Sequence, residues 1–290
     1  MKIAIVTDSG SGMSQQEAHE LGIYFLPLQI LHKDTQYLDG VSIDLTKVYD
    51  FMHKEEELTT SMPPMALVEN ALQHMKDDGC DTMIAVTITA GLSSTASVLF
   101  AAAKEAGMKT FMIDCFSTCH NQCYLAKSAK KLVDMGVAAE EIVTRLQESI
   151  ASSNTLIIPD DLQHLKRGGR LTPVAAALGG LLKIKPILQV NEASGGKIDV
   201  CEKVRTMVKA QQKAIDTFIA EGIGEDYEIT VLHTDVEEEG RILRMKLEEA
   251  FPGRPMTFGC IGAVISVHTG IGCLGMQYIK KVRGLEGSKH

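Results

Sequence analysis

Tryptophan is absent from this 290-residue chain, and aromatic residues together make up only 5% of it. Positive charge is also in short supply, because 37 Asp and Glu residues outnumber 29 Lys and Arg residues and leave a formal net charge of −8. Nucleic-acid-binding proteins neutralise phosphates with clustered Lys and Arg, so the acidic balance argues against nucleic acid as a partner. The hydrophobic share of 45% is typical of a globular protein and argues against a disordered chain.

Long hydrophobic runs are missing as well. No uncharged apolar stretch reaches the roughly 18 residues that a membrane-spanning helix needs. The apolar start at residues 1–6 gives way to Thr7-Asp8-Ser9, which is too early for a secretory signal. The seven cysteines are an odd number, and a chain of this length does not need a disulfide framework. These absences predict a cytoplasmic protein with reduced thiols.

Short apolar strands and helices alternate along the first half of the chain. Ser14 and Glu17 form the pattern of a capping box, Asp44 precedes a helical segment that ends at His53, and Pro27 favours an edge position for the second strand. The strands are expected at residues 2–6, 23–31, 82–88 and 109–113, and the later helices at residues 93–106, 118–135 and 138–151. This repeat predicts a mainly parallel sheet with helices on both faces, whose ligands bind beyond the carboxyl ends of the strands.

The second half follows a different pattern. Its strands are expected at residues 156–159, 181–190, 197–201, 228–232 and 262–267, and its long helices at residues 203–221 and 237–249. The turn Ala193-Ser194-Gly195-Gly196 would join two of these strands as a hairpin. We therefore predict an N-terminal α/β domain over residues 1–158 and a C-terminal α+β domain over residues 159–290, with mixed or antiparallel pairing in the second.

A hydroxyl-rich segment, Gly91-Leu92-Ser93-Ser94-Thr95, lies between a predicted strand and a predicted helix. One interpretation is a nucleophile elbow that lacks its last glycine, with Ser93, Asp235 and His268 as the trio of an esterase or thioesterase. A second is an anion site, in which these hydroxyls and the free N–H groups of the first helical turn hold a carboxylate or phosphate. The third is an ordinary helix cap without a ligand.

Near the end of the chain, Gly270-Ile271-Gly272-Cys273-Leu274-Gly275 has the glycine spacing of a dinucleotide-binding loop. Only residues 276–290 follow, too few for the rest of a βαβ unit, so the spacing does not indicate a nucleotide site. What remains is His268-Thr269 at the expected end of a strand. The glycines after it would let the backbone approach a ligand closely.

Three cysteines recur at intervals of four, and we expect them on one face of the helix over residues 118–135: Cys115, Cys119 and Cys123. Their spacing matches no structural zinc pattern, and free cysteine packs as a small hydrophobic residue. The sequence therefore predicts a buried stripe and no metal site.

A basic turn contains Lys166, Arg167 and Arg170 in an otherwise acidic protein. It is either a solvated turn or a docking face for an anionic partner. No P-loop sequence is present, which argues against ATP binding in the P-loop manner.

Taken together, the motifs resemble the DegV family of bacterial proteins, the fatty-acid-binding subunits of fatty acid kinase. The resemblance runs through nearly the whole chain and is carried by Ile5-Val6-Thr7-Asp8-Ser9, Thr60-Ser61-Met62-Pro63, Leu92-Ser93-Ser94-Thr95, Leu165-Lys166-Arg167-Gly168-Gly169-Arg170, Ile184-Lys185-Pro186-Ile187, Lys203-Val204-Arg205-Thr206 and His268-Thr269-Gly270-Ile271-Gly272. Each segment is short, but their order is specific. Met62 stands where the family usually has Gln, Ser94 where it usually has Gly, and Cys115 where Ser is common.

The resemblance implies the two-domain EDD fold of this family, with one long-chain fatty acid in a tunnel between the domains. It places the carboxylate of the fatty acid against Thr60, Ser93 and His268. The residues around this head-group site would be Ser61, Ser94, Thr95, Thr269 and Gly270.

The same resemblance implies a carrier that does no chemistry alone and holds no cofactor besides its lipid. A separate ATP-binding kinase subunit would phosphorylate the carboxylate, and the acyl-phosphate would pass to phospholipid synthesis, with a transient contact at a membrane surface. Lys166, Arg170 and Arg205 would face the kinase subunit.

Two physical arguments agree with these expectations. A carboxylate that is to be phosphorylated should be held by neutral donors, because a bidentate Arg pair would stabilise the ground state and compete with the incoming phosphoryl group. Met-rich walls in this Trp-free chain would suit a flexible tail, since Met fills irregular gaps, although the sequence does not identify which Met and Leu residues line the tunnel.

Overall fold

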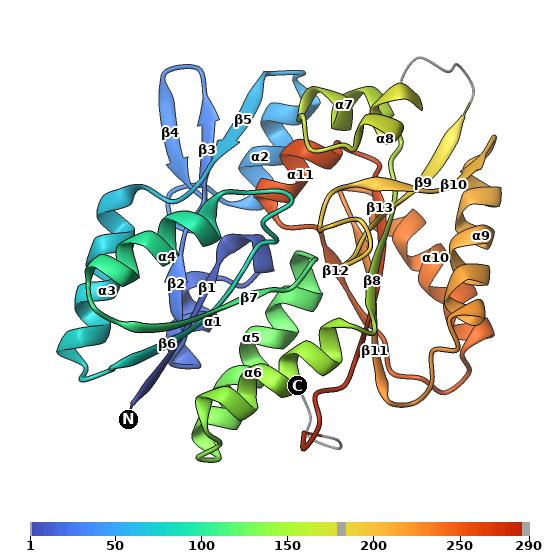
Figure 1. Cartoon of the computed structure of the whole chain (residues 1–290). Helices are drawn as coiled ribbons and strands as arrows, with labels where there is room; N and C mark the ends of the chain where they lie inside the picture. Colours follow the sequence, from blue (N-terminus) through green and yellow to red (C-terminus); the bar gives the residue numbers. More distant parts are fainter. Residues whose placement is uncertain (1, 179–183, 286–290) are drawn as a thin grey trace.

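A four-stranded parallel sheet forms the centre of the N-terminal half in the computed structural model, which describes residues 2–178 and 184–285 (Figure 1). The strand order is β2-β1-β6-β7, with β1 at Ile3–Asp8, β2 at Tyr24–Leu26, β6 at Thr82–Thr87 and β7 at Lys109–Asp114. The accompanying helices are α1 (Gln15–Glu20), α3 (Met65–Asp77), α4 (Thr95–Glu105), α5 (Cys119–Asp134) and α6 (Ala139–Ile150), and a 3-10 turn, η1 (Ser9–Ser11), follows β1. The predicted parallel sheet is confirmed.

Alternate residues of these strands belong to two separate cores. Ile5 and Ile84 pack with α5 and α6 on one face, whereas Val6 and Met83 pack with α3 and α4 on the other. Both faces of the sheet are thus covered by helices, which explains why β6 is buried along its whole length.

A smaller antiparallel sheet lies beside the first. Its order is β4-β3-β5, with β3 at Gln29–His32, β4 at Thr35–Leu38 and β5 at Leu58–Ser61, and α2 (Leu45–His53) shares its core. The single strand predicted over residues 23–31 is wrong, because Pro27 and Leu28 separate β2 from β3 and the two strands join different sheets. The expected edge position is confirmed for β2, and it suits a strand that ends at a proline without an N–H donor.

The C-terminal half is built on a six-stranded mixed sheet. Its order is β10-β9-β8-β13-β11-β12, with β8 at Ser153–Ile158, β9 at Lys185–Val190, β10 at Asp199–Val204, β11 at Tyr227–His233, β12 at Thr257–Cys260 and β13 at Leu274–Lys280. The helices of this half are α7 (Leu162–Arg167), α8 (Pro173–Leu178), α9 (Met207–Ala220), α10 (Glu237–Ala250) and α11 (Ala263–Thr269). Only the β11–β12 pair of this sheet is parallel, so the expected mixed pairing and the β9–β10 hairpin are confirmed; residues 181–183 of the predicted strand lie outside the described residues.

The strand predicted over residues 262–267 is wrong, because Ala263–Thr269 forms helix α11. Its β-branched residues favour a strand by propensity, but the segment is surrounded by other elements and buried on several sides. The helix packs between α2, β5 and α7, as Figure 1 shows near the top of the molecule. His268 consequently lies at the end of a helix and not at the end of a strand.

Buried polar contacts join the two halves. The Gln277 side chain on β13 donates to the Thr118 carbonyl (2.9 Å) and to Thr155 Oγ1 (2.8 Å), and Asn121 Nδ2 donates to the Tyr278 carbonyl (3.1 Å). Strand β8 is hydrogen-bonded into the six-stranded sheet of the C-terminal half, although it ends at Ile158 and therefore falls within the predicted N-terminal domain. The division into residues 1–158 and 159–290 stays a prediction, and this pairing favours a boundary ahead of β8.

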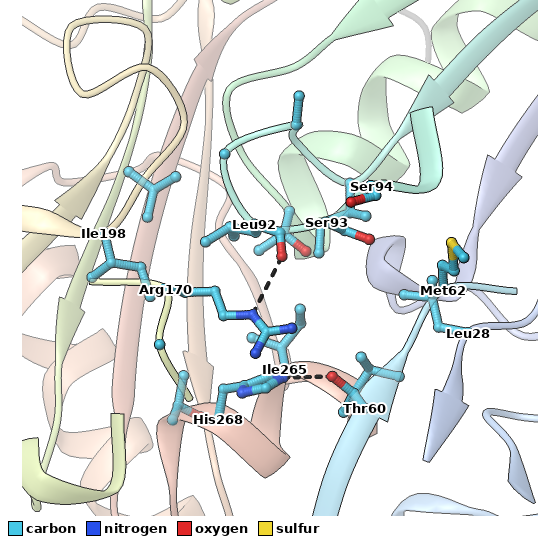
Figure 2. A pocket seen from close by; sticks show the side chains of 18 of the residues that line it. Leu28, Thr60, Met62, Leu92, Ser93, Ser94, Arg170, Ile198, Ile265 and His268 are labelled. Atoms are coloured by element: carbon cyan, nitrogen blue, oxygen red, sulfur yellow. Dashed lines mark hydrogen bonds between the residues drawn. The ribbon is translucent and has the colours of Figure 1, made fainter. Parts of the chain in front are cut away.

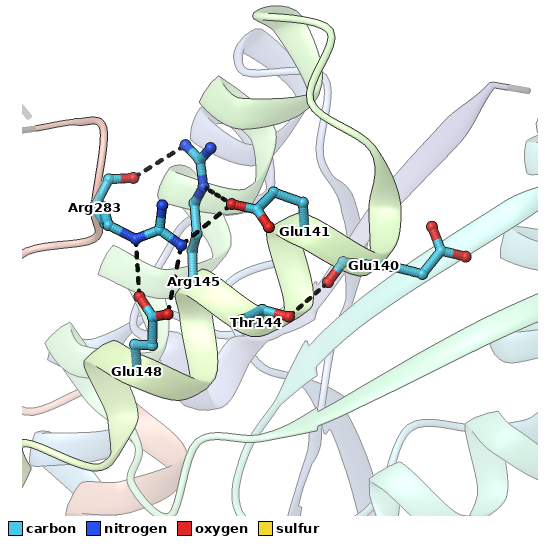
Figure 3. A network of polar contacts seen from close by, with 6 residues as sticks. All are labelled: Glu140, Glu141, Thr144, Arg145, Glu148 and Arg283. Carbon is cyan, nitrogen blue, oxygen red and sulfur yellow. Dashed lines mark hydrogen bonds and ion pairs between the residues drawn. The ribbon is translucent and has the colours of Figure 1, made fainter.

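An ion-pair network holds the segment after β13 against α6 (Figure 3). Arg283 Nε donates to Glu148 Oε2 (3.1 Å) and its terminal nitrogen donates to Glu141 Oε1 (3.2 Å), which also accepts from Arg145 Nε (2.7 Å). Arg145 in turn donates to the Arg283 carbonyl (3.2 Å). Arg283, Glu141 and Glu148 are largely exposed, so salt should screen their attraction.

Replacing Arg283 by Gln is expected to lower the melting temperature slightly at low salt and to have no effect near 1 M NaCl, where the screening length is only about 3 Å. Thermal unfolding at several NaCl concentrations measures this. Arg244→Gln is the matched control, since the described ion pair of Arg244 is with Glu248 on its own helix. A loss that persists at high salt would show that Arg283 acts through packing.

No helix in the described part of the chain is long and apolar enough to cross a membrane.

Candidate functional site

A cavity of about 510 Å³ opens between the two halves of the chain. It lies beyond the carboxyl ends of the parallel strands, as expected, because the loops after β6 and β7 supply Ser93 and Thr118. Strand β5 itself supplies Thr60, and α11 supplies His268 from the other half of the chain. The volume is within the range of roughly 300–1,000 Å³ that is usual for small-molecule sites.

Two of the predicted head-group residues are in direct contact. Thr60 Oγ1 and His268 Nε2 lie 2.6 Å apart and are hydrogen-bonded, although 208 positions separate them in the chain (Figure 2). Burial, together with the neighbouring Arg170 and His164, lowers the pKa of His268 to about 4. His268 is therefore neutral near pH 7, so its ring adds a polar group but no charge to the cavity wall.

Ser93 is the third predicted head-group residue, and it lines the cavity at the start of α4. Its hydroxyl is within hydrogen-bonding distance of Thr95 Oγ1 (2.9 Å) and accepts from the Thr95 backbone N–H (3.3 Å). Ser94, the residue at the N-cap position, makes no side-chain cap bond. The first turn of α4 thus adds N–H groups and the positive end of its dipole to this side of the cavity.

The guanidinium of Arg170 lies inside the cavity wall, between Leu92 and His268 in Figure 2. It donates from Nε to the Leu92 carbonyl (3.5 Å) and from a terminal nitrogen to the Gly168 carbonyl. The sequence predicted neutral donors alone, so this cation is an addition to the expected site. No local signal showed that the basic turn would fold its last arginine inward.

Much of the remaining wall is aliphatic, as in Leu28, Ile88, Ile157, Val190 and Ile198. The wall is not Met-rich, because Met62 is the sole methionine among the described residues that line the cavity. These aliphatic residues come from segments far apart in the chain, and a sequence pattern cannot show that they meet. Branched side chains are stiffer than Met and give the cavity a more defined shape.

The other predicted residues fall into three groups. Ser61, Ser94 and Thr269 line the cavity, whereas Thr95 and Gly270 are buried outside its wall. Lys166 and Arg205 are exposed on the surface and do not line the cavity. The glycines of the predicted close approach serve packing instead: a β-carbon on Gly270 would lie 3.1 Å from the His164 ring, and one on Gly272 would lie 2.8 Å from Cβ of Asp160.

The expected trio of Ser93, Asp235 and His268 does not form. Asp235 Oδ2 is hydrogen-bonded to His53 Nε2 at 2.5 Å, and the Nε2 atom of His268 is bonded to Thr60. An esterase of this type needs a carboxylate that orients the histidine. The geometry therefore does not support the esterase interpretation.

The cysteine stripe is confirmed as buried but not as one helix face. Cys115 precedes α5 in the loop after β7, whereas Cys119 and Cys123 lie on the helix. All seven cysteines are free thiols. Within residues 2–178 and 184–285, no group of three His, Cys, Asp or Glu side chains could hold a metal ion.

Two buried carboxylates, Asp8 and Asp39, lie next to the backbone of two residues of the cavity wall, Ile88 and Val264. Asp8 accepts from the backbone N–H groups of Gly10 and Ile88 (both 2.9 Å) and from Gln122. Asp39 lies beside the Ser9 hydroxyl and the Val264 N–H in the first turn of α11, and both groups favour its charged form. Burial raises the pKa of each carboxyl to about 6, against the opposing effect of these hydrogen bonds. Sequence reasoning missed Asp39, because it has no partner nearby in the chain.

Replacing Asp39 by Asn is expected to stabilise the protein relative to wild type as the pH rises from 4 to 7, by roughly 2 kcal/mol. A raised pKa means that the folded state holds the proton more tightly, so this carboxyl contributes stability below about pH 4 that is lost as the pH passes 6. Chemical denaturation at several pH values measures the effect, with exposed Asp34→Asn as the control. An unchanged pH dependence in Asp39→Asn would contradict it.

Comparisons with known proteins agree on one family. The sequence model of the DegV family matches residues 2–281. A DegV domain-containing protein of Halalkalibacterium halodurans is 32% identical over 284 residues, 97% of this chain and 99% of the relative. The protein DegV of Bacillus subtilis is 31% identical over 288 residues, 97% of this chain and 100% of the relative.

Solved structures show the same fold. A fatty acid binding DegV family protein from Streptococcus agalactiae superposes with a TM-score of 0.89 at 28% identity, covering 97% of this chain and 99% of that one. The crystal structure of DegV, a fatty acid binding protein from Bacillus subtilis, gives a TM-score of 0.84 at 30% identity, covering 97% and 100%. The predicted two-domain α/β fold is thereby confirmed. The chain belongs to the DegV family.

Proposed function

We propose that this protein binds one long-chain fatty acid and carries it without altering it. The observation that supports this most directly is the cavity, whose wall combines the polar side chains of Thr60, Ser93 and His268 with a set of aliphatic side chains. A carboxylate with a long apolar tail matches both parts. The fatty-acid-binding relatives with the same fold favour the same ligand class.

The energetics of a buried tail are favourable. Each methylene removed from water contributes roughly 0.8 kcal/mol, so a C16 tail could contribute on the order of 10 kcal/mol before the cost of ordering it. The carboxylate would be held by hydroxyls and by the first turn of α4, with Arg170 close by. Since His268 is neutral, it places no positive charge beside the carboxylate in addition to that of Arg170.

We further propose that the head group is presented to a separate ATP-binding kinase subunit for acyl-phosphate formation. The exposed Lys166 and Arg205 would contact that anionic partner, and a transient contact with a membrane surface would follow product transfer. Arg170 is partly buried in the cavity wall, so it would contact the kinase subunit only where that subunit reaches the cavity.

The test is denaturing mass spectrometry of an organic extract from freshly purified protein. We expect a long-chain fatty acid in stoichiometric amount, or its uptake when the purified protein is incubated with palmitate. ATP consumption by the protein with palmitate and no partner would contradict the carrier role. Failure to bind any fatty acid would overturn the proposed ligand.

A further inference from the structure

The last turn of α11, which carries His268, is held by a side chain from another element. This helix has only seven residues; its C-cap N–H, from Gly270, bonds the Ser266 carbonyl, and helix geometry gives the later carbonyls of the last turn no partner within the helix. His164 Nε2, on α7, lies 2.7 Å from the Val267 carbonyl oxygen. A histidine in this place satisfies one of those carbonyls, as basic side chains near helix C-termini do.

Arg167 defines which nitrogen of His164 carries the proton. The terminal guanidinium nitrogen of Arg167 lies 3.1 Å from His164 Nδ1. A guanidinium has donors only, so Nδ1 is the acceptor and the neutral ring has its proton on Nε2. That N–H points at the Val267 carbonyl, the residue directly before His268. Arg167 itself is exposed, so the contact begins at the surface of the basic turn.

The same segment contacts α11 at two further points. The His164 ring packs against Gly270, where a β-carbon would lie only 3.1 Å from the ring carbon Cγ. Gly168 packs against the free edge of His268, and a β-carbon there would lie 2.7 Å from His268 Nδ1. The His268 ring is therefore enclosed between Gly168 at Nδ1 and Thr60 at Nε2.

We propose that His164 is a positioning residue for the head-group site. It donates Nε2–H to the Val267 carbonyl and fills the space over Gly270, and it thereby fixes the last turn of α11 and the contact of His268 with Thr60. Arg167 keeps His164 in the tautomer that this role needs. The consequence for ligand affinity rests on the proposed fatty acid binding, whereas the placement of the His268 ring does not.

The experiment compares His164→Leu with His164→Gln. Leu removes the donor, whereas the Gln amide can supply an N–H in nearly the same place. In ligand-free protein labelled with 15N-histidine, we expect His164→Leu to shift the ring nitrogen resonances of His268, because its contact with Thr60 loosens. We expect His164→Gln to restore the wild-type positions. For palmitate, Kd should rise about 5-fold in His164→Leu and return to within about 2-fold in His164→Gln.

Two controls separate this role from general stability. His74→Leu changes an exposed histidine on α3, and it should leave the His268 resonances and Kd unchanged. Arg167→Gln should shift the His164 resonances toward a mixture of tautomers, and those of His268 to a smaller extent.

Unchanged His268 resonances in a folded His164→Leu variant would overturn the proposal, and so would a Gln variant that behaves like Leu. If Leu does not fold, Arg167→Gln still decides, because unchanged His164 and His268 resonances would contradict the role. A wild type that binds no palmitate would refute the proposed function, while the ligand-free spectra would still test the positioning role.

Discussion

Replacing Ser93 by Ala should weaken the binding of a long-chain fatty acid by roughly 5- to 150-fold. A hydrogen bond to a buried charged acceptor is worth about 1–3 kcal/mol, and Ser93 is the hydroxyl that begins α4 at the cavity wall. His268→Ala should cause a loss of the same size, because it removes the partner that holds Thr60 in place. Titration with palmitate in a calorimeter measures both.

Ser94→Ala is the matched control for the head-group prediction. Ser94 is the adjacent residue, but its side chain is exposed and makes no cap bond, so its loss should matter less. Melting temperatures of all variants show whether any loss of affinity reflects unfolding. Equal losses in Ser93→Ala and Ser94→Ala, or none in Ser93→Ala and His268→Ala, would show that the carboxylate is held elsewhere.

Replacing Ile198 by Trp should make the protein selective for shorter fatty acids. Ile198 is 5% exposed, and its side chain lies in the cavity wall opposite Met62 (Figure 2). A Trp ring there would displace about four methylenes of a bound tail, and at roughly 0.8 kcal/mol each this costs about 3 kcal/mol. Palmitate should therefore bind about 100-fold more weakly, while a C10 or C12 acid should keep most of its affinity.

Competition between acids of different length measures this selectivity directly. Val208→Trp is the control, because Val208 is 67% exposed on α9 and does not line the cavity. A loss that is equal for all chain lengths would mean that the substitution disturbs the fold or the head group. Unchanged affinity for palmitate would show that the tail does not pass Ile198.

Local signals in the sequence were sufficient for most of the regular elements. Asp44 accepts from the Lys47 N–H (2.8 Å) at the start of α2, and Ser14 accepts from the Glu17 N–H (3.1 Å) at the start of α1, as the capping patterns predicted. These signals act within one helical turn, so the sequence contains them in full. Helix α11 is the exception, because its β-branched residues favour a strand locally, whereas its contacts with other elements favour a helix.

The sequence by itself determined the family and the alternating first half, since both depend on short motifs in a recognisable order, and the three head-group residues that it predicts line one cavity. Tertiary structure alone decided how those residues meet. It placed Arg170 inside the cavity, paired Asp235 with His53 in place of His268, and brought His164 under α11. These contacts join segments up to 182 positions apart. The partners in these contacts are selected by packing of the whole chain, so local propensity does not predict them.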